Sequence, residues 1–364
     1  MIIQRPAPGI PFTRGLLVGS LLFFVPLLLL VVPRVGSAPG WQVTNLQGRA
    51  VAQFAAAPAE GLVLYYAATS TNGLQRSSIS TGNNAPGFEM WHAADNGLPG
   101  DSFWQVPAVQ RLAVNPNNGR ELVVLVAAND QSSLYYSNDG GASWQLVRGQ
   151  LEPQQAGALA LLADGSLAVA NGQRLLWRAG RDAGWVETPT WPASAGQAHS
   201  ILAVNAPRDH APARSLPRLL VVTTGGALFT LDGLNDSHWR PRPVGSASRV
   251  DLVIATPDGL YAAADRGIYR SRDAGTTWSH VGDLPGAAPV QAMAVDPANP
   301  NAVFVAVLGE GVMASYDGGA TWQTMGRGLE KQPVHALVID PRAQHQLLLA
   351  TGDGVWRHAL DPSE

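Results

Sequence analysis

Residues 315–322 read SYDGGATW, and near copies occur at 271–278 (SRDAGTTW) and at 137–144 (SNDGGASW). Each copy holds a serine, an aspartate, a glycine and a tryptophan at the same spacing. A catalytic site needs several different groups that converge on one point, whereas this pattern recurs along the chain. We therefore expect its serine and its aspartate to stabilise a turn rather than to take part in a reaction.

The three copies belong to a longer repeat of about 45 residues that fills the chain beyond residue 40. Each unit starts with an apolar strand, breaks at an Asp-Pro or Asn-Pro turn or its equivalent, and continues through further short apolar strands, as at 109–144, 290–325 and 334–360. Proline in this position favours a turn and cannot continue a central strand. The tryptophans that close the units are Trp41, Trp91, Trp144, Trp185, Trp239, Trp278 and Trp322.

The two ends of the repeat region complete each other. After Trp322 comes one more three-strand unit without a closing strand, while 41–46 (WQVTNL) is a closing strand with no unit before it. Joined, they predict an all-β fold, a seven-bladed β-propeller over 41–360 in which strand 41–46 completes the last blade. Six or eight blades are the alternative counts. An open β-solenoid, which would need caps at its ends, is the alternative architecture.

The pattern Ser-x-Asp-x-Gly-x-Ser/Thr-Trp resembles the Asp-box, or BNR repeat, found in the propellers of sialidases, other glycoside hydrolases, sortilin-type receptors and the photosystem II stability and assembly factor. In such a turn we expect the aspartate to accept backbone N–H groups, the serine to tie the strand end to the loop, the glycine to adopt a positive φ and the tryptophan to bury a large face. The structural Asp-box residues are then Ser137, Asp139, Gly141, Trp144, Ser271, Asp273, Gly275, Trp278, Ser315, Asp317, Gly319 and Trp322. Two other units carry incomplete boxes, around Asp182 and Asp232.

The resemblance to sialidases implies enzymatic activity only if their functional groups are present. Those enzymes use three arginines, one of them within an Arg-Ile/Leu-Pro motif, a tyrosine paired with a glutamate, and an aspartate. The Arg-Ile/Leu-Pro motif does not occur in this sequence. No pair of carboxylates indicates a glycosidase, and the histidines lack the spacing of metal ligands. We therefore expect no catalytic, cofactor-binding or metal-binding residue.

One set of polar residues stands inside apolar strands. The residue after the apolar start of each innermost strand would face the mouth of the central channel, and five of these seven residues are polar. They form a candidate binding ring, in which Ala52 and Gly157 are the apolar members. The polar members and two adjacent arginines are Gln110, Arg111, His199, Arg249, Asp251, Gln291 and His335. The alternative is that channel mouths are wet and tolerate polar residues without any function.

Two inserted loops interrupt the repeat and are further candidates for a docking surface. The loop 75–105 carries aromatic residues, which favour contacts with proteins or sugars when exposed. The loop 205–218 carries three arginines. Either loop is equally well explained as a tolerated insertion.

The first forty residues predict a membrane anchor. Residues 15–33 are uncharged and apolar, and a helix of this length spans about 28 Å, close to the thickness of the bilayer core. Arg5 and Arg14 precede the stretch, so the positive-inside bias places residues 1–14 in the cytoplasm and the chain beyond the linker 34–40 outside. The alternative is a signal peptide cleaved near Ala38, which would make the protein secreted.

Composition narrows the classes of function that remain. With 14% charged residues and a net charge of −3, the chain lacks the basic surface of a nucleic-acid-binding protein. These features favour a membrane-anchored, extracytoplasmic and non-enzymatic propeller that binds protein partners at the membrane surface as an assembly scaffold, as the resemblance to the photosystem II factor also implies. The alternative is a cell-surface, sialidase-like glycoside hydrolase or a carbohydrate-binding propeller.

Overall fold

The computed structural model describes the chain from Gly40 to Leu360, apart from residue 45 and residues 81–89, 101–105, 152–156, 205–216, 234–235, 286–287, 326–328, 330–331 and 342–345. The expected cytoplasmic tail 1–14 and membrane span 15–33 lie outside the described residues, as does the expected linker except for Gly40. Parts of the two inserted loops also lie outside them.

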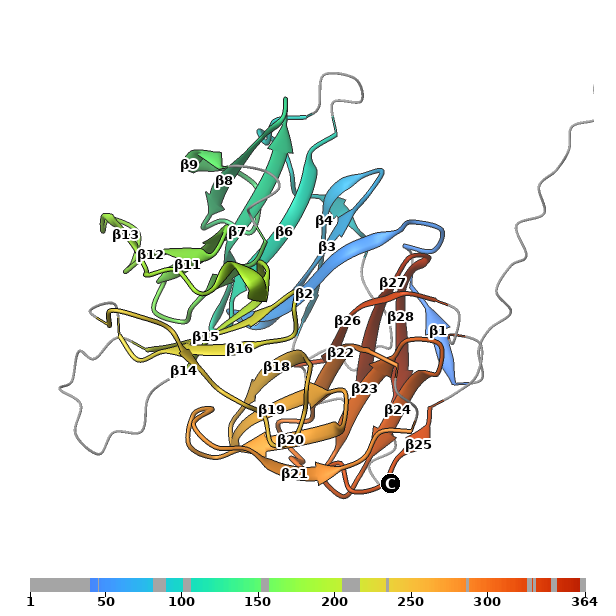
Figure 1. Cartoon of the computed structure of the whole chain (residues 1–364). Coiled ribbons are helices and arrows are strands. Elements are labelled where there is room, and N and C mark those ends of the chain that lie inside the picture. The colour runs from blue at the N-terminus through green and yellow to red at the C-terminus, as the bar shows by residue number, and fades with distance from the viewer. Residues whose placement is uncertain are drawn as a thin grey trace, which may run out of the picture. The chain divides into compact units, whose positions relative to one another are not determined.

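In the described part of the chain, the strands form seven four-stranded antiparallel sheets, the blades of a propeller (Figure 1). Blades 1 to 4 follow one another along the chain, and a short 3-10 helix η1 (Ala193–Ala195) precedes blade 4. Their strands are β2 (Val51–Ala59), β3 (Leu62–Thr69), β4 (Gly73–Ser80) and β5 (His92–Ala93) in blade 1; β6 (Ala108–Asn115), β7 (Asn118–Ala128), β8 (Gln131–Ser137) and β9 (Gln145–Leu151) in blade 2; β10 (Leu159–Leu161), β11 (Leu167–Asn171), β12 (Arg174–Arg178) and β13 (Trp185–Glu187) in blade 3; and β14 (Ala198–Val204), β15 (Arg218–Thr223), β16 (Leu228–Leu231) and β17 (Arg240–Pro241) in blade 4.

Blades 5 and 6 continue the series, and blade 7 is built from both ends of the described chain. Their strands are β18 (Val250–Thr256), β19 (Gly259–Ala264), β20 (Gly267–Ser271) and β21 (Ser279–Gly282) in blade 5; β22 (Val290–Val295), β23 (Val303–Val307), β24 (Gly311–Ser315) and β25 (Gln323–Thr324) in blade 6; and β26 (Val334–Ile339), β27 (Gln346–Thr351), β28 (Gly354–Ala359) and β1 (Trp41–Val43) in blade 7.

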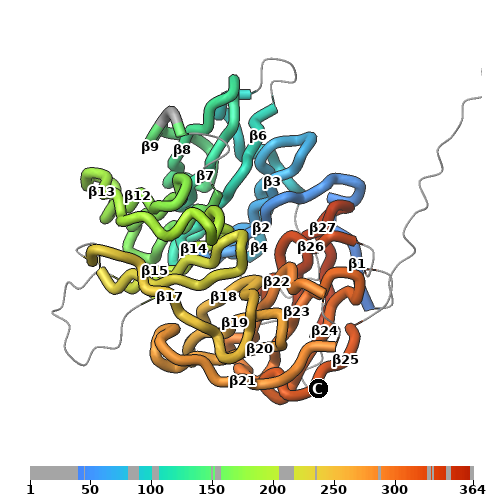
Figure 2. Tube along the Cα trace, viewed as in Figure 1, coloured from blue at the N-terminus to red at the C-terminus, as the bar shows by residue number. Residues whose placement is uncertain are grey.

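The blades close into a ring. The first strand of each blade contacts the first strand of the next, in the order β2, β6, β10, β14, β18, β22 and β26, and β26 contacts β2 again. The chain trace in Figure 2 follows the same circuit from blue to red. The prediction of seven blades is confirmed, and neither the six- and eight-bladed counts nor an open solenoid fits this arrangement.

The N-terminal strand closes the ring. Trp41 pairs with His358 and Val43 with Trp356, so that blue β1 lies beside red β28 in Figure 1. The closing strand ends at Val43 and is shorter than the predicted 41–46, although Thr44 N still donates to Val355 O (2.9 Å).

The core lies between neighbouring blades. The second strand of each blade is a nearly continuous apolar run, as a sheet buried on both faces requires. Between blades 2 and 3, for example, Val123 and Leu125 of β7 pack with Leu167 and Val169 of β11, and all four are at most 4% exposed. Burial of this kind contributes about 1.5–3 kcal/mol per large aliphatic side chain. A single blade would leave both of these faces in water, so the ring folds as one unit.

Candidate functional site

The three complete Asp-boxes share one hydrogen-bond pattern, and the box at residues 315–322 is representative. Ser315 Oγ donates to Asp317 Oδ1 (2.7 Å) and accepts from Gly319 N (2.8 Å). Thr321 donates twice to Asp317, from N to Oδ1 (2.9 Å) and from Oγ1 to Oδ2 (2.6 Å). The same four bonds, 2.5–3.0 Å long, surround the other two box aspartates. Both oxygens of each carboxylate are therefore engaged within their own turn.

The remaining box positions also have structural environments. The box glycines adopt left-handed φ values between 82° and 106°, which only glycine tolerates readily. The box tryptophans are half-buried, less than the sequence predicts, because each packs at the seam with the preceding blade rather than beneath its own. Trp144, for example, donates from Nε1 to Ala94 O of blade 1 (3.0 Å). The boxes thus fix the turns of blades 2, 5 and 6 and join them to their neighbours.

The electrostatics of the boxes follow from these bonds. Burial alone would raise the pKa of Asp139, but the side-chain and backbone donors of Ser143, the Ser137 hydroxyl and Ala142 N outweigh it and lower the pKa to about 2. In the same way, the Thr277 donors outweigh burial and lower the pKa of Asp273. The carboxylates are therefore held ionised as acceptors, which suits a turn and not a general acid.

Acid should weaken the boxes within a defined window. The pKa of Asp139 is 3.8 in an unfolded reference and about 2 in the folded protein, so its stabilisation is present above the higher value and is lost as the pH falls toward the lower one. We expect the gap in urea midpoint between the wild type and Asp139→Asn to be widest near neutral pH and to shrink between about pH 4 and pH 2. Asp182→Asn, in the incomplete box of blade 3, is the control. A gap that stays constant with pH would contradict this account.

The arginine loop 205–218 ends in a structural contact. Arg218 Nε lies 2.5 Å from Asp232 Oδ1, and the Arg218 side chain is only 12% exposed. Its Nη1 also donates to Ala274 O (3.0 Å) and to Thr276 Oγ1 (2.6 Å) in the box of blade 5. Arg218 therefore links the incomplete box of blade 4 to the complete box of blade 5. It is not part of a free basic surface, whereas the loop's other two arginines lie outside the described residues.

The opposite ends of the blades carry the predicted ring. In six of the seven first strands, the register with the second strand skips one residue at the same place, a β-bulge. The ring residue is the skipped one in each of these strands. In blade 3 the first strand begins only at Leu159, so that Gly157 precedes it. A bulged residue is left out of the ladder and its side chain is redirected. The skipped residues are Ala52, Gln110, His199, Asp251, Gln291 and His335.

A hollow of about 510 Å³ lies at this end, and its lining comes from blades 1, 4, 5, 6 and 7. It brings together five of the seven polar or charged residues predicted for the ring, and the apolar ring member Ala52, while Gln110 and Arg111 stand at the same end of blade 2 and do not line it. We call this hollow the channel mouth. Its members from the predicted set are His199, Arg249, Asp251, Gln291 and His335.

Several polar side chains of the ring form hydrogen bonds to the next blade and so hold the blades together. Asp251 accepts Val290 N (2.9 Å), which joins blade 5 to blade 6, and Gln291 accepts Val334 N (3.2 Å), which joins blade 6 to blade 7. Arg111 Nε donates to Gly157 O (2.5 Å) between blades 2 and 3. Sequence reasoning could mark these residues as polar in apolar strands but not show that their side chains bind the next blade.

Two histidines remain exposed at the channel mouth. Partial desolvation lowers the pKa of His199, the Arg111 charge lowers it further, and Asp251 acts in the opposite direction. Desolvation also lowers the pKa of His335. Both imidazoles are therefore mostly neutral at pH 7, and each can donate one hydrogen bond and accept another. Beside them, Arg249 Nε is paired with Asp251 Oδ1 (2.7 Å).

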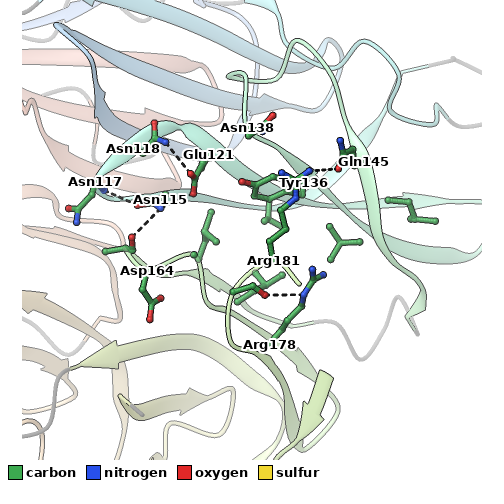
Figure 3. A pocket seen from close by; sticks show the side chains of 18 residues that line it. Asn115, Asn117, Asn118, Glu121, Tyr136, Asn138, Gln145, Asp164, Arg178 and Arg181 are labelled. Carbon is green, nitrogen blue, oxygen red and sulfur yellow. Dashed lines mark hydrogen bonds between the residues drawn. The ribbon is translucent and has the colours of Figure 1, made fainter. Parts of the chain in front are cut away.

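A second pocket, of about 580 Å³, lies at the box end between blades 2 and 3 (Figure 3). We call it the interblade pocket. None of its lining residues was singled out from the sequence as a binding residue. The sequence pointed to this pocket only indirectly, through the incomplete Asp-box of blade 3, which lies at the edge of the pocket. Its polar side chains include Glu121, Tyr136, Asp164, Arg178 and Arg181.

Residues 135–146, which contain the first box, match the BNR/Asp-box repeat family. The chain is thus a seven-bladed β-propeller that carries the Asp-box repeat. No curated protein sequence matches it. Among the described residues of the propeller, no helix is long and apolar enough to cross a membrane, and no cluster of three or more histidines, cysteines, aspartates or glutamates could hold a metal ion.

Solved structures share the fold of the propeller at low sequence identity. The GH74 xyloglucanase from Xanthomonas campestris matches 87% of this chain with a TM-score of 0.64 and 19% identity, and the match covers 53% of the enzyme. This chain therefore spans about half the length of that protein. YCF48 from Cyanidioschyzon merolae matches 89% of this chain and 100% of its own, with a TM-score of 0.60 and 14% identity. A structure of YCF48 bound to D1 peptide matches 88% of this chain and 97% of its own, with a TM-score of 0.58 and 15% identity.

Proposed function

We propose that the protein is a non-enzymatic propeller, anchored in a membrane by residues 15–33 and facing the extracytoplasmic side, that binds a protein partner at its channel mouth. The observation that carries the proposal is the hollow of about 510 Å³ to which five blades contribute. Its exposed histidines and its partly exposed arginine offer both donors and acceptors on a rigid frame.

The fold neighbours support a protein partner over a polysaccharide. YCF48, which has been solved with a bound peptide, matches over 97% of its length, whereas the match to the xyloglucanase covers 53% of that enzyme. The membrane anchor and the extracytoplasmic location rest on the apolar run 15–33 and on the arginines before it. In fractionation, the chain should sediment with membranes, and protease added to sealed cells should digest the propeller.

A glycoside hydrolase would need two carboxylates in one cleft, one of them as a proton donor. Glu121 and Asp164 both line the interblade pocket. Both oxygens of Glu121, however, accept amide hydrogens, from Asn115 Nδ2 (3.0 Å) and Asn118 Nδ2 (3.1 Å). Asp164 Oδ1 accepts Ser166 N (2.9 Å) in its own turn. These carboxylates act as acceptors, and the geometry favours a binding protein.

The channel mouth can be tested without disturbing the contacts between blades. In the double variant His199→Ala/His335→Ala, Asp251 and Gln291 keep their bonds to the next blade. We expect the variant to recover at least tenfold less partner than the wild type when each is used to capture proteins from detergent-solubilised membranes, since central interface residues often contribute about 2 kcal/mol or more.

The matched control is His238→Ala/His280→Ala, which removes two exposed histidines that do not line the channel mouth. It should capture the partner as the wild type does. Equal recovery by the wild type and the His199/His335 variant would refute the channel mouth as the binding surface. Release of sugars from a polysaccharide by the purified chain would refute the non-enzymatic assignment.

A further inference from the structure

The interblade pocket borders the turn of blade 3 that has no complete Asp-box, since Arg178, Gly180 and Arg181 line it. In blades 2, 5 and 6, the box serine pairs across the sheet with the first buried aliphatic residue of the second strand, as Ser137 does with Leu122. In blade 3 that partner, Leu167, faces Arg178 instead. Two residues further on, where a box has its aspartate, blade 3 has Gly180. In this turn of blade 3, the long cationic side chain of Arg178 therefore stands where a box has its serine hydroxyl. No carboxylate stands at the position of the box aspartate, which Gly180 occupies.

One wall of the pocket is acidic. Glu121 is fixed by amide donors from Asn115 and Asn118, and Asp164 stands nearby on the first turn of blade 3, as Figure 3 shows. Each oxygen of an ionised carboxylate offers about two acceptor sites. Glu121 is thus held in place with acceptor capacity left for a ligand.

The other wall is basic. The guanidinium of Arg181 lies 4.9 Å from the centre of the Tyr136 ring and donates to Gln145 Oε1 (2.5 Å). That of Arg178 lies 5.8 Å from the centre of the Trp185 ring and donates from Nε to Gly180 O (3.1 Å). Stacking and hydrogen bonding hold both planar groups in place. Within the described part of the chain, the other guanidinium nitrogens of these two arginines have no hydrogen-bond partner.

Between the two walls the pocket is aliphatic. Val123, Leu161 and Leu167 line it and belong to the buried core between the blades. Leu146 lines it as well and is 61% exposed. An aliphatic side chain of a ligand would therefore find apolar surface in the middle of the pocket and opposite charges at its two sides.

We propose that the interblade pocket binds an extended peptide segment of a partner protein that carries aliphatic residues between a basic and an acidic side chain. The basic group would pair with Glu121 and Asp164, and the acidic group with Arg178 and Arg181. A purely anionic or purely cationic ligand would meet like charge on one wall. A neutral sugar could hydrogen-bond to both walls but would form an ion pair with neither, and the aromatic ring that lines the pocket, Tyr136, already carries the Arg181 guanidinium group. The site lies at the opposite ends of the blades from the channel mouth, so the two proposals stand or fall separately.

The test uses blocked tetrapeptides that differ in the charge and the order of their two end residues, titrated into the full chain in mild detergent by calorimetry. The sequences are Lys-Leu-Leu-Glu and its reverse, Glu-Leu-Leu-Glu, Lys-Leu-Leu-Lys and Gln-Leu-Leu-Gln. We expect one of the two mixed-charge peptides to bind at least tenfold more tightly than the other three compositions. In Arg181→Glu, which changes an exposed loop residue, that peptide should lose at least tenfold in affinity and Lys-Leu-Leu-Lys should gain.

Arg174→Gln is the matched control, because Arg174 is an arginine at the start of strand β12 (Arg174–Arg178), which precedes the Arg181 loop, and it does not line the pocket. It should bind the peptides as the wild type does, and circular dichroism should show that both variants are folded. Equal affinity for all the peptides, or no binding at millimolar concentration, would overturn the proposal. So would binding of a neutral tetrasaccharide that is lost in Arg181→Glu.

Discussion

Replacing Trp41 with alanine is expected to lower the free energy of unfolding by about 3–5 kcal/mol. The Trp41 side chain is 2% exposed and lies in the strand that closes the ring. Its Nε1 donates to Met325 O of blade 6 (3.1 Å), and its ring packs edge-on against His358 at a centroid distance of 5.0 Å. The substitution thus removes a large buried surface and leaves the Met325 carbonyl without its donor. Urea unfolding followed by circular dichroism measures the loss.

Val43→Ala is the control for this variant, since Val43 lies on the same strand and is 36% exposed. It should cost less than about 1 kcal/mol, as surface substitutions usually do. If the two variants lost stability equally, strand β1 would matter only for its backbone pairing, and Trp41 would not fix the closure.

The second large effect is expected when the three box serines are replaced together, in Ser137→Ala/Ser271→Ala/Ser315→Ala. Each hydroxyl is buried, accepts the N–H of the box glycine at 2.8 Å and donates to the box aspartate. Leaving a buried N–H without a partner costs about 1–3 kcal/mol. Because each serine hydroxyl bonds within its own box, in a different blade, the losses should add. The total, about 3–9 kcal/mol, approaches the whole stability of many domains.

The measurement is a urea series over the single, double and triple variants. Stability should fall in roughly equal steps, and the triple variant should be unfolded or close to it. The control is Asn138→Ala/Arg272→Ala, which changes exposed residues that follow two of the serines and should have little effect. A triple variant as stable as the wild type would show that the box hydroxyls are dispensable.

The repeat made the ring and its closure predictable. The Asp-box recurs at the same position of the repeat. The closing strand at the start of the propeller has no blade of its own, and the last unit has no closing strand, so the two are expected to pair. The lengths of the outer strands were less predictable, because the boundary of β1 at Val43 depends on where the pairing with β28 ends. The sequence alone suggests that Asp182 is the aspartate of an incomplete box in blade 3, and this alignment is wrong. The pairing of Arg178 with Leu167 shows that Gly180 occupies the aspartate position.

The candidate sites were predictable to different degrees. Polar residues at one position of each apolar first strand indicated the channel mouth, but whether a side chain such as that of Asp251 faces a ligand or the next blade depends on geometry that a sequence does not contain. The interblade pocket was not predicted at all. Its walls come from two blades and from strand ends that are distant in sequence, and no local pattern brings Glu121 and Arg181 together.

The closure of the ring by β1 also sets an order of events for a newly made chain. β1 is synthesised before every other strand of the propeller, and its partner β28 is the last. Contacts of such long sequence separation form late, because the intervening chain must be ordered first. Until then, β28 presents an unpaired outer edge, the kind of surface that recruits strands from other molecules. We therefore expect the protein to be prone to aggregate in the interval between the emergence of β28 and the docking of β1.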